Sequence, residues 1–431
     1  MTNSRPGHTI GVLLITLSTA LLVVSLSGCS KPVAPVAGPS PATPSVGAPL
    51  TDEECLATAR EIEAAVVSGD SSALDKLIDW DAVNDRFTSG IDAPAQFRKD
   101  FLQGLKESWL QNKGLTNGII DAAKNGGSYT LLHSHSQEKR RWLLFRLLLP
   151  ESGLNYHDLL LARRPDGKIK VVDLYFYLSG ELLSQSLRRS YIQLVAENSG
   201  GVLERLSGAD KQLAKNIKNM AAMVEAGRSG KFREVIDIYN KLPDDIKKNK
   251  GILIQRIQAF QNLGDDAEYT RSIADFRKFY PDDRCIDMIS IDFYQIKKNY
   301  AEALACVDRL DSAVHGDPYL QIYRANLHME QNEPVAARAD LTRGIEAEPE
   351  ILGFYTSLIE LSLREKKFDE TLQILRLIRT KFQLELGDLR TVPSYKDFVE
   401  SPQYQEWLKD NPVPAEKPET GKDSGDKPNN D

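Results

Sequence analysis

Cysteine is scarce in this chain of 431 residues, which has only four: Cys29, Cys55, Cys285 and Cys306. The last three are an odd set, and they are too far apart for a disulfide framework or a zinc site. An oxidising compartment would permit a bridge between Cys285 and Cys306. We expect these two on paired helices, although at heights that do not obviously match, so the sequence leaves this bridge open.

Motifs of known catalytic chemistry are also missing. The sequence has no phosphate-binding glycine loop, nucleophile elbow, paired-cysteine metal motif or HExxH. Its formal net charge is −7, and a mildly acidic chain lacks the basic surface of a nucleic-acid binder. We therefore expect no nucleic-acid partner, no cofactor and no metal. The absence of motifs makes an enzyme less expected without excluding one.

Long apolar runs are absent except near the N-terminus. There a short polar stretch with Arg5 precedes an apolar run from Ile10 to Leu26, which small and polar residues interrupt. A run this short, followed by small residues, is typical of a cleaved secretory signal rather than of a membrane span. We expect a signal peptide over residues 1–28.

The end of this run, Leu26-Ser27-Gly28-Cys29, resembles the lipobox of bacterial lipoproteins. The resemblance implies cleavage after Gly28 and lipidation of Cys29, with acylation of the new amino terminus. Two or three acyl chains on one residue give stable anchoring to a membrane. Ser30 rather than Asp follows the cysteine, which in that family favours the outer membrane, facing the periplasm, if the cell has one. The chain would then belong to the cell envelope.

Two segments lack the large apolar residues that a core requires. Residues 29–50 are mostly Pro, Ala, Ser, Gly, Val and Thr, and they predict an extended spacer behind the anchor. Residues 411–431 are rich in Pro, Gly, Asn, Asp, Glu and Lys and predict a disordered tail. Folded sequence is expected between them.

Residues 51–200 predict an α+β domain with an antiparallel sheet. Thr51 and Glu54 form a capping-box pattern that opens a helix ending at Gly69-Asp70. Further helices are expected over 72–78, from Pro94 through Trp109, and over 180–196. Between them, four short runs separated by turn residues predict a meander of strands at 128–135, 141–149, 155–163 and 168–178.

This order of elements resembles the cone-shaped nuclear-transport-factor-like superfamily. In that superfamily a curved sheet wraps a long helix around a pocket. The resemblance rests on the order of elements and on no diagnostic motif. Members include enzymes, binding domains and structural modules, so the fold would not select a function.

Residues 207–410 predict an all-α solenoid. Helix-like runs recur there with a period of about 34 residues, and they start at Phe232, Asp266, Tyr300, Pro334 and Phe368. Five windows of two helices follow at 216–249, 250–283, 284–317, 318–351 and 352–385. A last segment with four aromatic residues, over 389–408, is expected to cap the final window.

The windows resemble tetratricopeptide repeats. The resemblance rests on small turn residues, an aromatic residue that opens the second helix, a small residue inside that helix and a closing proline: Gly230, Gly264, Phe232, Tyr300, Phe368, Ala303, Ala337, Pro281, Pro349. Pro334 replaces the aromatic residue in the fourth window, and the small eighth residue of the first helix survives only as Ala325. The resemblance implies a concave groove that binds a protein or peptide.

The groove is expected to be polar. Position nine of the first helix gives an evenly spaced ladder, with one member in each window: Val224, Gln258, Asp292, Asn326, Glu360. Further groove positions hold Gln261, Asn262, Gln295, Glu330 and Arg364, beside the apolar Met220, Ile254, Met288, Ile322 and Tyr319. Amide and charged groups can hydrogen-bond an extended peptide. The Lys and Asn pair by which some relatives hold a terminal carboxylate is missing.

The leading hypothesis is therefore a lipid-anchored adaptor that binds a protein partner in the cell envelope. Two alternatives remain open. The first is a small-ligand binder or enzyme that uses the α+β domain, where His133, His135, His157 and Asp158 could form a metal or acid/base site and Asp173 or Tyr175 could line a pocket. The second is a structural role in envelope assembly.

Overall fold

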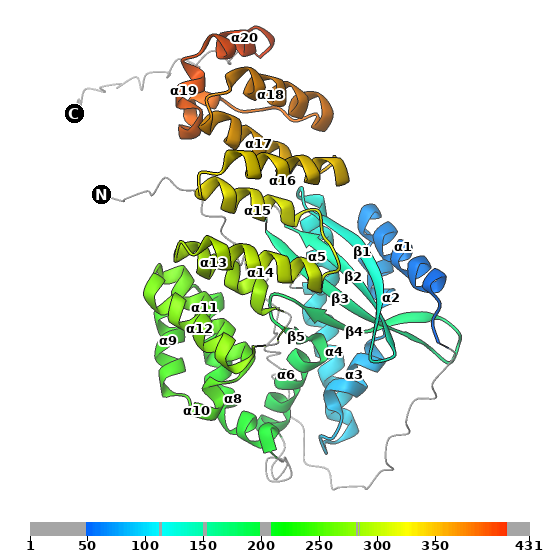
Figure 1. Ribbon diagram of the computed structural model, residues 1–431. Helices are drawn as coiled ribbons and strands as arrows, with labels where there is room; N and C mark the ends of the chain where they lie inside the picture. Colours follow the sequence, from blue (N-terminus) through cyan, green and yellow to red (C-terminus); the bar gives the residue numbers. More distant parts are fainter. Residues whose placement is uncertain are drawn as a thin grey trace, which may run out of the picture. The chain divides into compact units, whose positions relative to one another are not determined.

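The computed structural model describes residues 49–111, 114–149, 153–198, 208–281, 283 and 285–411 (Figure 1). The chain divides into two compact units, the first ending at Asp317 and the second starting at Pro318. The predicted signal peptide, Cys29 and the predicted tail from 412 onward lie outside the described residues. Over the residues that are described, no helix is long and apolar enough to cross a membrane.

The first unit opens with five helices. They are α1 (Asp52–Ser68), α2 (Ser71–Leu77), α3 (Trp80–Thr88), α4 (Ala95–Gln111) and α5 (Leu115–Lys124). The predicted capping box is confirmed, since the Thr51 side chain accepts from the Glu54 amide and Glu54 accepts from the Thr51 amide. Gly69 ends α1 in the left-handed conformation, as expected. Helices α3 and α5 were not predicted.

The predicted meander is confirmed. Strands β1 (Ser128–Gln137), β2 (Arg140–Leu148), β3 (Leu154–Arg163) and β4 (Ile169–Phe176) pair antiparallel in sequence order, and a short β5 (Glu181–Leu182) adds to β4. Gly167, with a φ of 83°, sits in the predicted turn before β4. Helix α6 (Leu183–Asn198) follows the sheet.

The two faces of the sheet differ in character. On β2, Leu143, Phe145 and Leu147 face a core that includes Ile62 of α1 and Ile119 of α5. The alternate residues Trp142, Leu144 and Arg146 lie on the opposite face, because side chains alternate along a strand. The first face forms the hydrophobic core of the domain, and the second face carries the polar groups described below.

Three helix pairs complete the first unit. They are α8 (Gly208–Arg228) with α9 (Phe232–Lys241), α11 (Lys250–Leu263) with α12 (Asp266–Phe279), and α13 (Ile286–Ile296) with α14 (Tyr300–Ala313), and a one-turn helix α10 (Asp244–Lys247) precedes α11. Successive pairs also pack on one another, through α9 with α11 and through α12 with α13. Helix α6 packs on α8, which joins the helices to the sheet region.

The second unit holds two further pairs and a terminal segment. The pairs are α15 (Leu320–Glu330) with α16 (Pro334–Ala347), and α17 (Leu352–Arg364) with α18 (Phe368–Phe382). Short helices η2 (Leu389–Thr391), η3 (Pro393–Tyr395), α19 (Lys396–Val399) and α20 (Pro402–Asp410) follow, and α20 packs on α18. Phe398, Tyr404 and Trp407 are buried there, so this terminal segment covers the end of the last helix pair.

The turn inside each helix pair repeats in its geometry. The residue in the left-handed conformation is Gly230, Gly264, Lys298, Asn332 or Lys366, evenly spaced along the chain, with φ between 55° and 69°. The next amide bonds the carbonyl five residues back in all five turns, as from Lys231 to Ala226 and from Lys367 to Ser362. The second helices begin at Phe232, Asp266, Tyr300, Pro334 and Phe368, as the sequence predicts.

A sheet region followed by a largely helical region is therefore the fold of this chain, which confirms the coarse prediction of fold class.

Candidate functional site

The residues predicted to line a groove lie on the first helix of each pair, where they differ in exposure. Asn262, Glu330 and Arg364 are exposed. Gln258, Gln261, Gln295, Asn326 and Glu360 are half-buried. The apolar residues expected beside them, Met220, Ile254, Met288, Ile322 and Tyr319, are all buried and belong to the cores of the two units.

Asp292 differs from the rest of the ladder because it is only 8% exposed. It lies in a run of five consecutive buried residues of α13, Met288 to Asp292. Successive helical residues are about 100° apart, so five of them point in every direction around the axis. The first two turns of α13 therefore have no open face, which the polar residues of this helix did not indicate.

In the second unit three of the predicted groove residues form an ion-pair network. Arg364 of α17 bonds Glu360 one turn away at 2.7 Å and Glu330 of α15 at 3.2 Å. All three side chains are at least one-third exposed, so each pair contributes little to stability. The network places charged groups on a surface shared by α15 and α17, with Asn326 half-buried on the same helix as Glu330.

The histidines that the sequence groups together are divided between the two faces of the sheet. His157 pairs with Phe145 on the core face and contacts the rings of Tyr129 and Phe176. Burial lowers the pKa of His157 to about 3, so it is neutral in the folded chain. His133 and His135 lie on the opposite face. The three imidazoles and Asp158 considered as an alternative therefore do not form one group, since adjacent residues of one strand point to opposite faces.

Asp158 does join His135. The fully buried carboxylate bonds Nε2 of His135 through both oxygens, at 2.9 and 3.0 Å. The ring of Trp142 stacks beside that of His135, with 6.5 Å between their centroids. Nε2 of His133 is buried and has no hydrogen-bond partner among the described residues. Burial, together with the nearby His315 and His135, lowers the pKa of His133 to about 4, although the negative charge of Asp158 acts to raise it.

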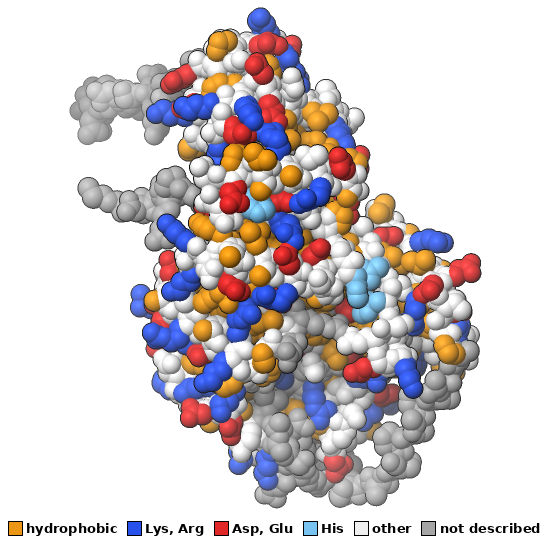
Figure 2. Space-filling view, viewed as in Figure 1, with side chains coloured by type: hydrophobic (Ala, Val, Ile, Leu, Met, Phe, Trp, Pro, Cys, Tyr) orange, Lys and Arg blue, Asp and Glu red, His pale blue; other side chains and the backbone are white. Residues whose placement is uncertain are grey.

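The third imidazole comes from His315, which the sequence did not suggest. Its ring centroid lies 4.9 Å from that of His133 and 5.8 Å from that of His135, and we call these three residues the histidine cluster. Figure 2 shows histidine side chains gathered at one place on the surface. His315 follows α14 in a turn, and nothing local to its sequence indicates a contact with a strand much earlier in the chain.

Two residues further on, the same turn carries a buried ion pair. Asp317 bonds Arg146 of β2, and its other oxygen accepts from the Tyr156 hydroxyl of β3 at 2.7 Å. Asp317 and Arg146 are each 2% exposed. Breaking one partner of a buried pair typically costs about 3–5 kcal/mol, because the other charge is left uncompensated. The turn from Val314 to Asp317 is therefore held firmly against the polar face of the sheet.

Asp173 and Tyr175, considered as pocket residues, have structural partners. Asp173 accepts from the Ser184 amide and hydroxyl at the start of α6, at 3.1 and 2.6 Å. Burial raises the pKa of Asp173, and the bonds from Ser184 oppose this. Tyr175 donates to Asp283 at 3.0 Å, and Lys250 bonds the same carboxylate. Both residues thus tie the sheet to helices.

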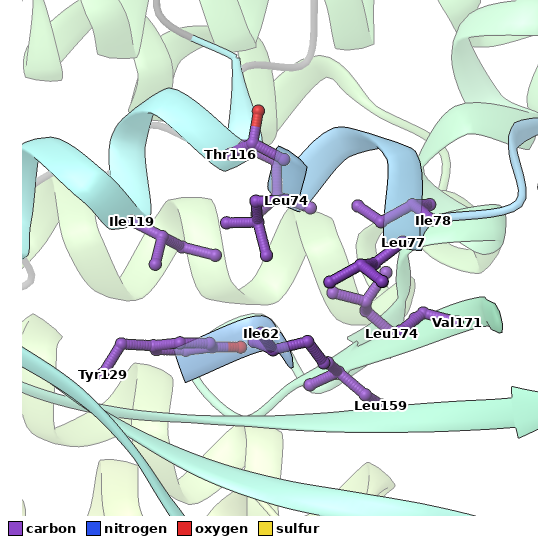
Figure 3. A pocket seen from close by; sticks show the side chains of 11 residues that line it. Ile62, Leu74, Leu77, Ile78, Thr116, Ile119, Tyr129, Leu159, Val171 and Leu174 are labelled. Carbon is purple, nitrogen blue, oxygen red and sulfur yellow. The ribbon is translucent and has the colours of Figure 1, made fainter. Parts of the chain in front are cut away.

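A pocket does lie inside the sheet domain, between helices α1, α2 and α5 and the core face of the sheet (Figure 3). Its walls are nearly all aliphatic, with Thr116 and Tyr129 the only polar side chains. Its enclosed space is about 10 Å³, on the order of what one water molecule needs. In this conformation the pocket is too small for an organic ligand.

The three cysteines that the structure describes form no bridge. Cys55, Cys285 and Cys306 are all buried and free, so the bridge that the sequence left open between Cys285 and Cys306 is absent. Burial raises the pKa of the Cys306 thiol to about 11 and also raises that of Cys285. Neither thiol is suited to act as a nucleophile, because the thiolate is the reactive form.

Over the described ranges, no group of three or more His, Cys, Asp or Glu side chains is arranged to hold a metal ion. No protein-family model, no curated protein and no solved structure matches the chain.

Proposed function

We propose that the chain is a lipid-anchored scaffold of the cell envelope that binds a protein partner through a tetratricopeptide-like helical array. The observation that supports this most is the repeat of one turn geometry at five evenly spaced positions. Similar helix pairs that pack on their neighbours are the construction of a solenoid, and solenoids offer extended binding surfaces.

We assign the partner site to α15 and α17 of the second unit. Asn326, Glu330 and Arg364 combine amide and charged groups there, and Glu330 and Arg364 are exposed. Such groups can bond the backbone and side chains of an extended peptide. Asp292 of the first unit is buried and takes no part in this site. Gln258, Gln261 and Asn262 of α11 are a second candidate surface of the same chemistry, in the first unit.

The alternative function, a small-ligand site in the sheet domain, has less support. The apolar pocket has a volume of about 10 Å³, and the histidines considered for a metal or acid/base site are on opposite faces. The resemblance of this domain to the nuclear-transport-factor-like cone therefore adds no ligand to the proposal. We propose instead that the sheet domain supports the helical array, since its last helix α6 packs on α8.

The site is tested by crosslinking in cells. In one variant of the full-length chain a photoreactive residue replaces Asn326. In a second variant it replaces Glu346, which is exposed on α16, the second helix of the same pair. We expect a defined adduct with an envelope protein from position 326 and none from position 346. The substitution Glu330→Arg should weaken the adduct at least severalfold, because a second positive charge would face Arg364.

The matched control is Glu346→Arg, which makes the same change on α16 and should leave the adduct unchanged. Equal adducts from both positions, or equal loss with both charge reversals, would remove α15 and α17 as the partner surface. A normal level of folded protein by circular dichroism must accompany each variant.

The anchor is tested separately with Cys29→Ala. We expect the wild-type protein to sediment with membranes and to incorporate labelled palmitate, and the variant to do neither. Wild-type protein that carries no label would contradict the lipoprotein proposal. If the variant also behaves like a deletion of 207–410 in cells, a structural role in envelope assembly is favoured over a scaffold, because a scaffold released from the membrane still binds its partner.

A further inference from the structure

The histidine cluster joins two parts of the first unit that are far apart in sequence. His133 and His135 belong to β1, and His315 belongs to the turn after α14. Their ring centroids are 4.9, 5.7 and 5.8 Å apart. Three imidazoles at this separation pack well when neutral. If they gain protons, they place like charges within the same distance.

Asp158 can compensate only part of this charge. Both of its oxygens already bond Nε2 of His135. The buried Nε2 of His133 faces no acceptor within the described residues. Arg146, on the same face of the sheet, is paired with Asp317. A proton on His133 therefore lies beside the imidazoles of His135 and His315. Protonation of His133 then weakens the contact between the strand and the turn.

The turn has two residues in the left-handed backbone region. His315 and Gly316 both have positive φ, 54° and 98°, and the amide of Asp317 bonds the Asp311 side chain at 2.8 Å. A non-glycine residue in the left-handed region is held there only by its surroundings. The contacts that hold it to the sheet are the histidine cluster and the buried pair of Asp317 with Arg146.

We propose that the histidine cluster is a pH-sensitive latch, and that proton uptake by His133 in mild acid increases the fraction of molecules in which the turn from Val314 to Asp317 is released from the polar face of the sheet. The latch is closed at neutral pH. Opening exposes Asp317, Arg146 and the Tyr156 hydroxyl to water. This inference does not depend on whether the chain binds a partner.

The expected size of the effect follows from proton linkage. His133 has a pKa of about 4 in the closed latch, and an ordinary value of about 6.5 is expected when it is open. Closed protein is therefore favoured above pH 6.5, and the open fraction grows as the pH falls from 6.5 toward 4. Between pH 6.5 and 5.5 this one group raises the ratio of open to closed by about fivefold.

The test is hydrogen exchange followed by mass spectrometry on the full-length protein in nonionic detergent. Peptides that cover 311–320 are compared at pH 7.5, 6.5 and 5.5, after correction for the intrinsic exchange rate. We expect protection of this segment to fall about fivefold or more between pH 6.5 and 5.5, while peptides from α16 keep theirs. Unchanged protection in the wild type overturns the proposal.

Two variants test whether the histidine cluster carries the response to pH. His315→Asn keeps a residue that tolerates positive φ and cannot gain a proton in this range, and His133→Gln removes the buried imidazole. Each should reduce the loss of protection in acid. His328→Gln is the control, since His328 also bonds a buried carboxylate, Asp340 at 2.7 Å, but lies in the second unit.

If His315→Asn and His133→Gln both open in acid as the wild type does, the histidine cluster does not carry the response, and the proposal is wrong. His315 is exposed, so its variant is expected to fold even if His133→Gln does not.

Discussion

Lysine occupies a backbone conformation that suits glycine in two of the five repeated turns. Lys298 and Lys366 have φ values of 55° and 56°, at the position where the first two turns have Gly230 and Gly264. A side chain costs on the order of 1 kcal/mol in this region, and glycine avoids most of that cost. The same fold is thus built with an unfavourable residue where the sequence departs from the repeat pattern.

Replacing Lys298 by glycine tests this directly, because positive φ is the feature that sets it apart from its neighbour. We expect Lys298→Gly to raise the free energy of unfolding by about 0.5–1 kcal/mol in urea denaturation. The neighbouring Lys297 has a φ of −73° in the right-handed region, so Lys297→Gly should lower it by a similar amount. Destabilisation by both would show that the turn does not have the assigned conformation.

At the same scale, the sequence predicted the positions of only some of the histidines in the sheet domain. The alternation of strand residues correctly placed His133 and His135 on one face. It should also have separated His157 from Asp158, since adjacent strand residues point to opposite faces. His315 was beyond prediction, because its position depends on how the turn after α14 packs on a distant strand.

At the scale of elements, local sequence signals correctly predicted where several helices and strands begin or end. The capping box fixed the start of α1, glycine and proline turns separated the strands, and the regular period predicted the first residue of every second helix. Helix α5 was missed although Ile119, Ile120 and Ala122 are buried, because Gly118 weakens the helical pattern and Gly114 provides no side-chain cap. Helix α3 is only 9 residues long, too short for periodicity to indicate.

Burial of whole elements was the least predictable property. The groove position assigned to Asp292 implied that α13 has an open face, yet Asp292 and the neighbouring Ser290 are both buried. The sequence of α13 reads Ile-Asp-Met-Ile-Ser-Ile-Asp, which is apolar on several sides, and such a helix is typical of a position covered all round. The repeat resemblance assigned groove positions by spacing alone, and spacing does not tell what packs against a helix.

At the scale of the whole molecule, stability should depend on pH through a histidine that is not part of the latch. His157 is 1% exposed in the core of the sheet domain, and burial lowers its pKa to about 3. Unfolded chain takes up this proton near pH 6.5, whereas folded chain does not until about pH 3. The stability is therefore complete above pH 6.5 and falls as the pH decreases through this window.

The expected slope is up to about 1.4 kcal/mol per pH unit from this one group. Urea unfolding of wild-type protein and of His157→Gln at pH 7.5, 6.5 and 5.5 measures it, and the carboxylates common to both proteins cancel in the difference. Glutamine can still accept the bond that Asn155 makes to Nε2 of His157 at 3.0 Å. We expect the variant to be less stable at pH 7.5 and to lose less stability in acid. His315→Asn is the control, and it should keep the wild-type slope of this global transition apart from the contribution of the latch. Equal slopes for wild type and His157→Gln would mean that His157 is not neutral and buried in the folded core.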